Sequence, residues 1–304
     1  MTYQLLHANM IMEESMELRV LRYFLAVARE ENITKAAELL HVTQPTLSRQ
    51  LAELEDELGV TLFDRKSHKI RLTQDGLLLQ SSAREIVELA DKTRAQFQQE
   101  ETISGTISFG CGELMSMSKL STIMAEFKRQ YPLVHFDIES GNADHIKYKL
   151  EKGLLDFGLL LEPVDITEYE FLRMNIKEKW GAFLRKDYPI ARKKYMKPKD
   201  FQNATIILSK REAVRNEIMN WLGPYAKGVE ESTTFNLNYN GMTAVRQGMG
   251  IAISLNLACT YDDLVFLPLR PALEHSSVLA WKKNQPHTKT IDKFIEFAQA
   301  RLLP

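Results

Sequence analysis

The sequence predicts an α/β protein whose N-terminal third is all-helical. Up to about residue 100, apolar residues recur at spacings of three and four, the period of helices that bury one face. From residue 101 onward, short apolar runs typical of strands alternate with helical stretches, the order expected of parallel βαβ units. The length of 304 residues leaves room for two or three such domains.

Composition and charge fit a globular protein of the cytoplasm. The net charge is −1 and 44% of residues are hydrophobic. No apolar run approaches ~18 residues, so no membrane-spanning helix is expected. Residues 1–15 form an N-terminal extension without the cationic start and long apolar core of a signal peptide. Two cysteines, Cys111 and Cys259, are too few for a disulfide framework and indicate a reducing compartment.

Two helices are expected before residue 41. In the first, Leu18, Leu21, Leu25 and Ala28 repeat at spacings of three and four, with Phe24 beside that stripe. The second has Thr34 as its expected cap. Its small and apolar residues suit close packing, and they are Ala36, Ala37 and Leu40.

A third helix is expected from Thr43 to Gly59. Thr43 can cap it, and Pro45 falls in the first turn, where its missing N–H is harmless. Val42 and Leu47 occupy the positions of a hydrophobic staple. Gly59 is the expected C-cap. One stripe faces a core, and it consists of Leu47, Leu51, Leu54 and Leu58.

Two short helices joined by a tight turn are typical of a helix-turn-helix, whose second helix enters the DNA major groove. In the helix expected from Thr43 to Gly59, the outer face of the first turns carries hydrogen-bonding side chains. The alternative interpretation is that this helix is an ordinary amphipathic surface helix. Residues 62–63 and 70–72 predict two strands around a basic tip, a wing that can lie along phosphates. The candidate DNA-binding residues are Thr34, Thr43, Gln44, Pro45, Thr46, Ser48, Arg49, Arg65, Lys66 and Lys69.

The predicted DNA-binding segment is not basic overall. Nine Lys and Arg residues face ten Asp and Glu residues between Met16 and Asp75, a net charge of −1. We therefore expect DNA affinity to depend on a local patch around Arg49 and the wing.

A long helix is expected after Thr73, which can cap it. Its apolar stripe is narrow and fits a coiled-coil seam that pairs two copies of the chain. The alternative is that the stripe packs on the helix's own domain. The stripe consists of Leu79, Ala83, Ile86, Ala90, Thr93 and Phe97.

The remainder predicts alternating strands and helices. Strands are expected at residues 106–109, 134–138, 157–161, 180–184, 206–208, 235–237, 251–254 and 277–281. Helices are expected at residues 120–130, 144–151, 211–222, 241–247 and 291–302.

Residues 21–65, LRYFLAVAREENITKAAELLHVTQPTLSRQLAELEDELGVTLFDR, and the closing RLTQDG at 71–76 resemble the N-terminal domain of LysR-type transcriptional regulators. The segments GTISFG at 105–110, DYPIA at 187–191 and VRQGMGIA at 245–252 stand where that family has recurring motifs. The resemblance covers residues 16–304. It implies a homodimeric or homotetrameric regulator whose partners are double-stranded DNA and a small-molecule effector, with no membrane partner.

The resemblance also implies a division of the chain. A winged helix-turn-helix covers residues 16–74 and a linker helix covers residues 75–100. A two-lobed, periplasmic-binding-protein-like effector domain covers residues 101–304. Its first lobe is expected at residues 101–162 and 269–304, and its second lobe at residues 163–268.

An effector is expected in the cleft between the lobes, because ligands of open α/β sheets bind beyond the carboxyl ends of the strands. By resemblance, Asn142 stands where family members place a ligand-contacting group; otherwise it is a turn or cap residue. Glu113 is unusual there, and either disfavours an anionic effector or pairs with a cationic one. The candidate effector-binding residues are Cys111, Gly112, Glu113, Met115, Ser116, Gly141, Asn142, Ser209 and Asn238.

No arrangement typical of an enzyme or cofactor site is found in the sequence. The histidines have no metal-ligand spacing, and neither a phosphate-binding loop nor a nucleophile elbow is present. Cys111 and Cys259 belong to different predicted lobes, so we expect free, packed thiols. The sequence predicts a non-enzymatic, DNA-binding transcriptional regulator modulated by a small molecule. The alternative is a two-lobed binding protein or enzyme with an accessory DNA-binding module.

Overall fold

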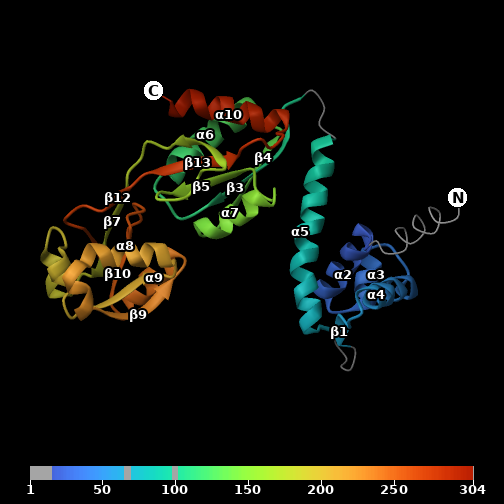
Figure 1. Cartoon of the computed structure of the whole chain (residues 1–304), viewed down its shortest axis with the longest axis horizontal. Coiled ribbons are helices and arrows are strands. Elements are labelled where there is room, and N and C mark those ends of the chain that lie inside the picture. The colour runs from blue at the N-terminus through green and yellow to red at the C-terminus, as the bar shows by residue number, and fades with distance from the viewer. Residues whose placement is uncertain (1–15, 65–69, 98–101, 304) are drawn as a thin grey trace. The chain divides into compact units, whose positions relative to one another are not determined.

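The computed structural model describes residues 16–64, 70–97 and 102–303. The chain divides into two compact units, Met1–Gln98 and Gln99–Pro304, which are blue to teal and green to red in Figure 1. Among the described residues, no helix is long and apolar enough to cross a membrane. Each unit has its own buried core and is described separately.

The N-terminal unit consists of four described helices and a two-stranded ribbon. Its elements are α2 (Leu18–Glu30), α3 (Ile33–Leu39), α4 (Gln44–Leu58), β1 (Phe63–Asp64), β2 (Arg71–Leu72) and α5 (Gln74–Phe97). Strands β1 and β2 are antiparallel, with Phe63 opposite Leu72. The predicted wing is therefore confirmed at its two strands. Its basic tip, residues 65–69, lies outside the described residues.

The core of the N-terminal unit corrects two details of the predicted stripes. In α2 the buried positions are Val20, Leu21, Phe24 and Val27 rather than the stripe that begins at Leu18. The buried face of α2 therefore includes Phe24, and the centroid of its ring lies 5.3 Å from that of Phe63. In α4 the buried stripe ends at Leu54, because Leu62 and Phe63 close the core there and Leu58 is 39% exposed.

Helix α5 has one face on its own domain and another that is open. The Oγ1 of Thr73 accepts from the N–H of Gly76 at 3.0 Å, which confirms the predicted cap. Ala83 is fully buried, and Leu79 and Val87 pack beside it against the core formed with α2. The neighbouring face exposes large apolar side chains in the described unit, namely Leu78, Ile86, Leu89 and Phe97.

The first lobe of the C-terminal unit is a five-stranded sheet in the order β4-β3-β5-β13-β6. Strand β3 is parallel to β4 and β5, whereas β13 is antiparallel to both β5 and β6. The elements are β3 (Gly105–Cys111), α6 (Met117–Gln130), β4 (Val134–Ser140), α7 (Ala143–Glu151), β5 (Phe157–Leu161), β6 (Tyr169–Arg173), β13 (Ser277–Lys282) and α10 (Lys289–Leu302).

Strand β6 falls in the segment assigned from sequence to the second lobe. It pairs instead with β13 in the first-lobe sheet, from Arg173 opposite Val278 to Tyr169 opposite Lys282. Only Tyr169 and Leu172 of this strand are buried, so it lacks the apolar run that marks the neighbouring strands. The chain therefore crosses to the second lobe after residue 173 rather than at 163.

The second lobe is a mixed sheet in the order β11-β7-β10-β8-β9, with β12 also paired to β7. The predicted strand at 235–237 is displaced: the strand ends at Phe235, and Leu237 already forms the N-cap of the next helix. The elements are β7 (Glu178–Arg185), η1 (Pro189–Arg192), η2 (Pro198–Phe201), β8 (Thr205–Ser209), α8 (Glu212–Leu222), η3 (Gly223–Gly228), β9 (Glu230–Phe235), α9 (Asn238–Arg246), β10 (Ile251–Leu255), β11 (Leu264–Pro268) and β12 (Glu274–His275).

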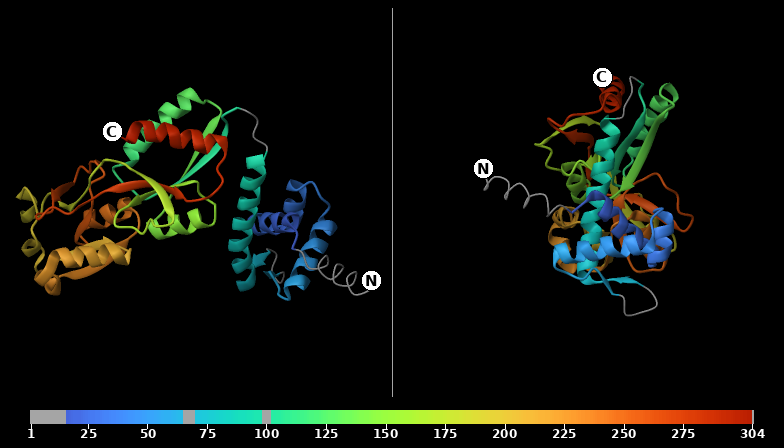
Figure 2. Two further views of the ribbon diagram at one scale, coloured as in Figure 1. Left: turned by 45° about the horizontal axis from the view of Figure 1, so that its top comes forward. Right: turned by 90° about the vertical axis from the view of Figure 1, so that its right-hand side faces the viewer.

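Helices cover both faces of each sheet, because successive strand residues point to opposite faces. In β5, Leu159 faces the core with α6 and α10, whereas Leu160 faces α7. In β8, Ile207 faces α9 and Ile206 faces α8. Figures 1 and 2 show the two lobes and the two segments that connect them. This arrangement brings strand ends and helix starts of both lobes to one cleft.

Candidate functional site

The start of α4 has the predicted capped geometry. Thr43 is extended, and its Oγ1 accepts from the N–H of Thr46 at 3.4 Å. Thr34 does not cap α3 as predicted. Asn32 caps that helix instead, with its Oδ1 accepting from the N–H of Lys35 at 3.0 Å, because Asn32 is the last extended residue and Thr34 lies in the first turn.

The outer face of α4 is polar and accessible in the described unit. Gln44, Pro45, Thr46 and Arg49 are exposed and Ser48 is half-buried, while Leu47 beneath them is fully buried. Gln44 Nε2 donates to Ser48 Oγ at 2.8 Å, and Arg49 lies 3.5 Å from the Glu53 carboxylate with 73% of its side chain exposed. Five candidate residues thus share one face. The candidates Arg65, Lys66 and Lys69 lie outside the described residues.

In the C-terminal unit, a cavity of about 120 Å³ lies between the two lobes. Six of the predicted effector-binding residues line it: Gly112, Glu113, Gly141, Asn142, Ser209 and Asn238. Sequence reasoning missed its apolar walls and one cation. These further lining residues are Leu114, Ala143, Ile146, Leu159, Leu160, Leu161, Trp180, Arg211, Val214, Phe235, Ser254 and Leu255.

Three predicted residues, Cys111, Met115 and Ser116, do not line this cavity. Met115 and Ser116 lie at the start of α6, where free backbone N–H groups attract an anion. Both N–H groups instead donate to the fully buried carboxylate of Glu178, at 2.8 and 2.9 Å. The Oγ of Ser277 lies 3.5 Å from the same carboxylate. The anion for this helix start is therefore a side chain of β7, where the second lobe begins.

Glu113 has a comparable role between the lobes. Its carboxylate accepts from the N–H of Asn238, the first residue of α9 in the second lobe, at 2.5 Å. Asn238 in turn accepts from Ser254 Oγ through its side-chain oxygen at 2.5 Å. The unusual carboxylate thus satisfies a helix start of the chain itself. It joins the first lobe to the second.

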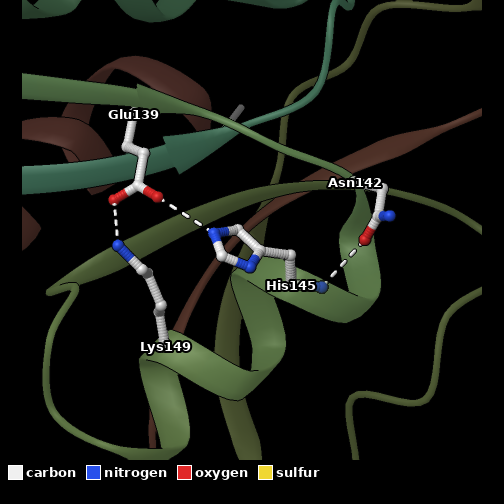
Figure 3. Close-up of polar contacts among 4 residues, drawn as sticks. All are labelled: Glu139, Asn142, His145 and Lys149. Carbon is white, nitrogen blue, oxygen red and sulfur yellow. Dashed lines mark hydrogen bonds and ion pairs between the residues drawn. The ribbon is translucent and has the colours of Figure 1, made fainter. Parts of the chain in front are cut away.

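Asn142 caps α7, as Figure 3 shows: its Oδ1 accepts from the N–H of His145 at 2.8 Å. Beside it, Glu139 accepts from Lys149 at 2.6 Å and lies 3.0 Å from His145 Nε2. Burial opposes ionisation of Glu139, but Lys149 and His145 outweigh it and lower the pKa of that carboxyl. A Cβ at Gly141 would lie 2.9 Å from His145 Cδ2, so a side chain there would displace the His145 ring.

Arg211 is the N-cap residue of α8, and it lines the cavity. Its Nε is buried and makes no hydrogen bond among the described residues. The carboxylate of Asp144, on α7 of the opposite lobe, lies 3.5 Å away, close enough for an ion pair only. The side chain of Asp144 is 71% exposed, whereas that of Arg211 is 17% exposed.

A hydrogen-bonded chain runs from the cavity wall into the segments that connect the lobes. Trp180 Nε1 donates to His275 Nδ1 at 2.8 Å, and His275 Nε2 lies 2.7 Å from Glu217 on α8. Because the indole N–H can only donate, Nδ1 is the acceptor and Nε2 carries the proton toward Glu217. The orientation of Trp180 is therefore fixed from behind.

The cysteines differ from each other in their surroundings. Cys111 is buried and Cys259 is exposed, so the expectation of packed thiols fails for Cys259, which follows β10 in a surface loop. Burial and the charge of Glu113 raise the pKa of the Cys111 thiol. Among the described residues, no group of three His, Cys, Asp or Glu side chains could hold a metal ion.

Comparison with known proteins identifies two family models. Residues 100–303 match the LysR substrate binding domain, and residues 18–77 match the bacterial regulatory helix-turn-helix protein model of the lysR family. The chain is 28% identical over 282 residues to the hydrogen peroxide-inducible genes activator of Pectobacterium carotovorum subsp. carotovorum, which covers 89% of this chain and 92% of that protein. It is 39% identical over 166 residues to the HTH-type transcriptional regulator BsdA of Bacillus subtilis, covering 53% and 56%.

Solved structures show the same fold. The crystal structure of full-length CbnR complexed with target DNA matches with a TM-score of 0.71 at 21% identity, over 94% of this chain and 99% of that chain. The family models cover the helix-turn-helix and both lobes described above. The chain therefore belongs to the LysR family of DNA-binding transcriptional regulators, with an effector-binding substrate domain after the helix-turn-helix.

Proposed function

We propose that this regulator reads DNA with the first two turns of α4. The supporting observation is a polar face that is accessible and rigidly backed: Gln44, Thr46 and Arg49 are exposed, while Leu47 and Leu51 beneath them are fully buried. Gln suits adenine and Arg suits guanine in the major groove. In this proposal Arg65, Lys66 and Lys69 contact phosphates, and Pro45 and Thr34 fix how the helix-turn-helix approaches the DNA. The protein acts in the cytoplasm, where its DNA is.

Pairing of two chains through α5 completes this proposal. The exposed apolar side chains of Ile86, Leu89 and Phe97 need a cover, and Ala83 on the adjoining face is already used by the helix's own domain. A second α5 provides that cover and presents two reading helices to one operator. CbnR, which has the same fold, was solved in complex with its target DNA.

The cleft is the proposed effector site. Its walls come from both lobes, so a ligand that contacts both stabilises one lobe arrangement over another, and it shifts DNA binding by that difference in affinity. One relative is a hydrogen peroxide-inducible activator. Cys111 does not favour such a role here, because the reactive form of a cysteine is the thiolate and burial raises its pKa. We therefore propose a non-covalent effector and a regulator rather than an enzyme.

Gel-shift titrations on the DNA upstream of the protein's own gene test this function. Gln44→Ala and Arg49→Ala should each weaken binding to the matched site by about 1–3 kcal/mol and barely change binding to scrambled DNA. Lys66→Ala should weaken both and flatten the salt dependence. Gln74→Ala, exposed at the start of α5, is the control. If Gln44→Ala and Lys66→Ala behaved alike on both DNAs, the assignment of reading helix and wing would be wrong.

A further inference from the structure

The cleft contains one cationic donor that the chain does not satisfy. Two buried side-chain atoms among the described residues lack a hydrogen-bond partner, Ser116 Oγ and Arg211 Nε, and of these residues Arg211 lines the cavity. The starts of three neighbouring helices are already served: Met115 and Ser116 by Glu178, Asn238 by Glu113 and His145 by Asn142. The start of α8, where Arg211 is the N-cap residue, has no side-chain cap. An incoming acceptor would thus meet Arg211 at the uncapped start of α8.

The present partner of Arg211 is a poor one. The Asp144 carboxylate lies 3.5 Å from Nε and is largely in water, a setting in which ion pairs contribute little. A carboxylate bound at ~2.7–2.9 Å in the fork of a guanidinium would satisfy two N–H groups together. Because a buried N–H without a hydrogen bond is unfavourable, replacing Asp144 by a closer acid would be favoured.

We propose that the effector is a small monoanionic organic acid whose acid group takes the place of Asp144 at Arg211. Its apolar body would lie against Leu159, Val214 and Phe235. A cavity of about 120 Å³ suits one small ring or a short chain, since a cavity of ~150 Å³ accommodates benzene. This inference rests on the proposed effector role of the cleft.

The charges around the cavity select against other ligand classes. A cation would be placed beside Arg211, and the nearby Glu113 carboxylate is already held by the start of α9. A dianion such as phosphate would bring a second negative charge into a cavity that the Glu113 carboxylate also lines. A single negative charge on an apolar body is therefore the best match.

The same exchange gives a route for regulation. Asp144 belongs to α7 in the first lobe and Arg211 to the start of α8 in the second, so their ion pair joins the lobes. A bound acid would release Asp144 and bridge the lobes through the ligand instead. The lobes would then be held by a different set of contacts in the liganded state, which is what linkage to DNA binding requires.

Calorimetric titration of the full-length protein tests the inference with butanoate, hexanoate and cyclohexanecarboxylate, each beside its neutral primary amide. We expect at least one acid to saturate, and its amide to bind roughly tenfold more weakly or worse. Arg211→Gln should weaken that acid by about tenfold or more, and Asp144→Asn should tighten it a few-fold by removing a competitor. Arg215→Gln, on the same helix but paired with Glu231 and outside the cavity lining, is the matched control.

The outcomes separate the ligand class from the site. If no acid saturates, or if acid and amide bind alike and Arg211→Gln has no effect, the inference is refuted. Val214→Trp, which fills the cavity, distinguishes an error in the ligand class from an error in the effector site. If binding depends on an open cavity but not on charge, the effector site stands and only the acid class is overturned. Acid binding that survives Val214→Trp would overturn both. Melting curves of each variant confirm that it is folded.

Discussion

The buried carboxylate of Glu178 offers a sharp test of how the two lobes are held. It is completely buried, and it accepts from the N–H groups of Met115 and Ser116 at 2.8 and 2.9 Å. These residues precede α6 in the first lobe, while Glu178 opens β7 and leads into the second. Removing the carboxylate therefore affects a helix start and a lobe connection together.

The size of the effect follows from the groups left behind. Glu178→Ala leaves two buried N–H groups unpaired, at about 1–3 kcal/mol each. It also removes a negative charge from a helix N-terminus, which contributes up to ~2 kcal/mol in partly buried settings. Because some of this loss is recovered by water and relaxation, we expect a total of about 3–5 kcal/mol. Glu178→Gln keeps one acceptor but turns its NH₂ toward the other N–H, so about 2–3 kcal/mol is expected.

Urea unfolding followed by tryptophan fluorescence measures this directly. Trp180, Trp221 and Trp281 are the three tryptophans of the chain, and all belong to the C-terminal unit, so the signal reports that unit alone. Glu178→Ala should lower the transition midpoint by about 1–2 M urea. Glu168→Gln, an exposed carboxylate beside β6, should leave it unchanged. A Glu178→Ala midpoint within 0.2 M of wild type, at about the same slope, would refute the capping role.

Three further predictions follow from other contacts. Ile86→Glu should yield a folded monomer by sedimentation, because Ile86 is 41% exposed on its own domain. Ala83→Glu should instead unfold the N-terminal unit in circular dichroism melts, because Ala83 is fully buried. If the Ile86→Glu variant stayed dimeric, α5 would not form the dimer interface. Burial opposes ionisation of Asp200, but its bonds to Lys193 and the Lys197 N–H prevail and lower its pKa. The stability that Asp200 contributes is thus present above its unfolded pKa, ~3.9, and is lost as pH falls through the folded pKa. Urea midpoints measured down to about pH 2.5 should therefore fall less steeply with pH in Asp200→Asn than in wild type. Parallel curves for the two proteins would contradict this. Gly141→Ala should lose about 1–3 kcal/mol through the clash with His145, and the loss should shrink in the His145→Ala background; an unchanged loss there would exclude the ring as the cause.

Local signals predicted the helix-turn-helix well because each lies within a few residues of its effect. Thr43, Pro45 and Gly59 delimit α4 as their chemistry requires, and Gly59 has the left-handed φ of 66° that favours glycine. The wrong prediction that Thr34 caps α3 misses by two residues, because Asn32 stands two positions earlier and is an equally good cap. The strands with apolar runs were also predictable, whereas β6 buries too few residues to produce one.

The site was only partly predictable, since its decisive pairs are distant in sequence. The backbone positions at strand ends could be located because parallel strands end at one edge of a sheet, and six of those residues line the cavity. Glu113 bonds to a residue 125 positions away, and Glu178 to one 62 positions away. Nothing near Glu178 or Arg211 in the sequence marks them, because burial and pairing arise only when the lobes pack.

These distant pairs determine which anion lies at a helix N-terminus in this protein. A helix N-terminus is a ready anion site, and a sequence with helix starts facing a cleft suggests that the ligand supplies the anion. Here Glu178 and Glu113 supply it at α6 and α9, and each reaches across from the other lobe. The helix dipoles of α6 and α9 therefore hold the lobes together, and those two are not free to bind a ligand. Charge selection in the cleft then falls to a side chain, Arg211, whose only ionic partner among the described residues is the exposed Asp144. A ligand can exchange with such a weak partner, and it cannot readily displace a buried one such as Glu178.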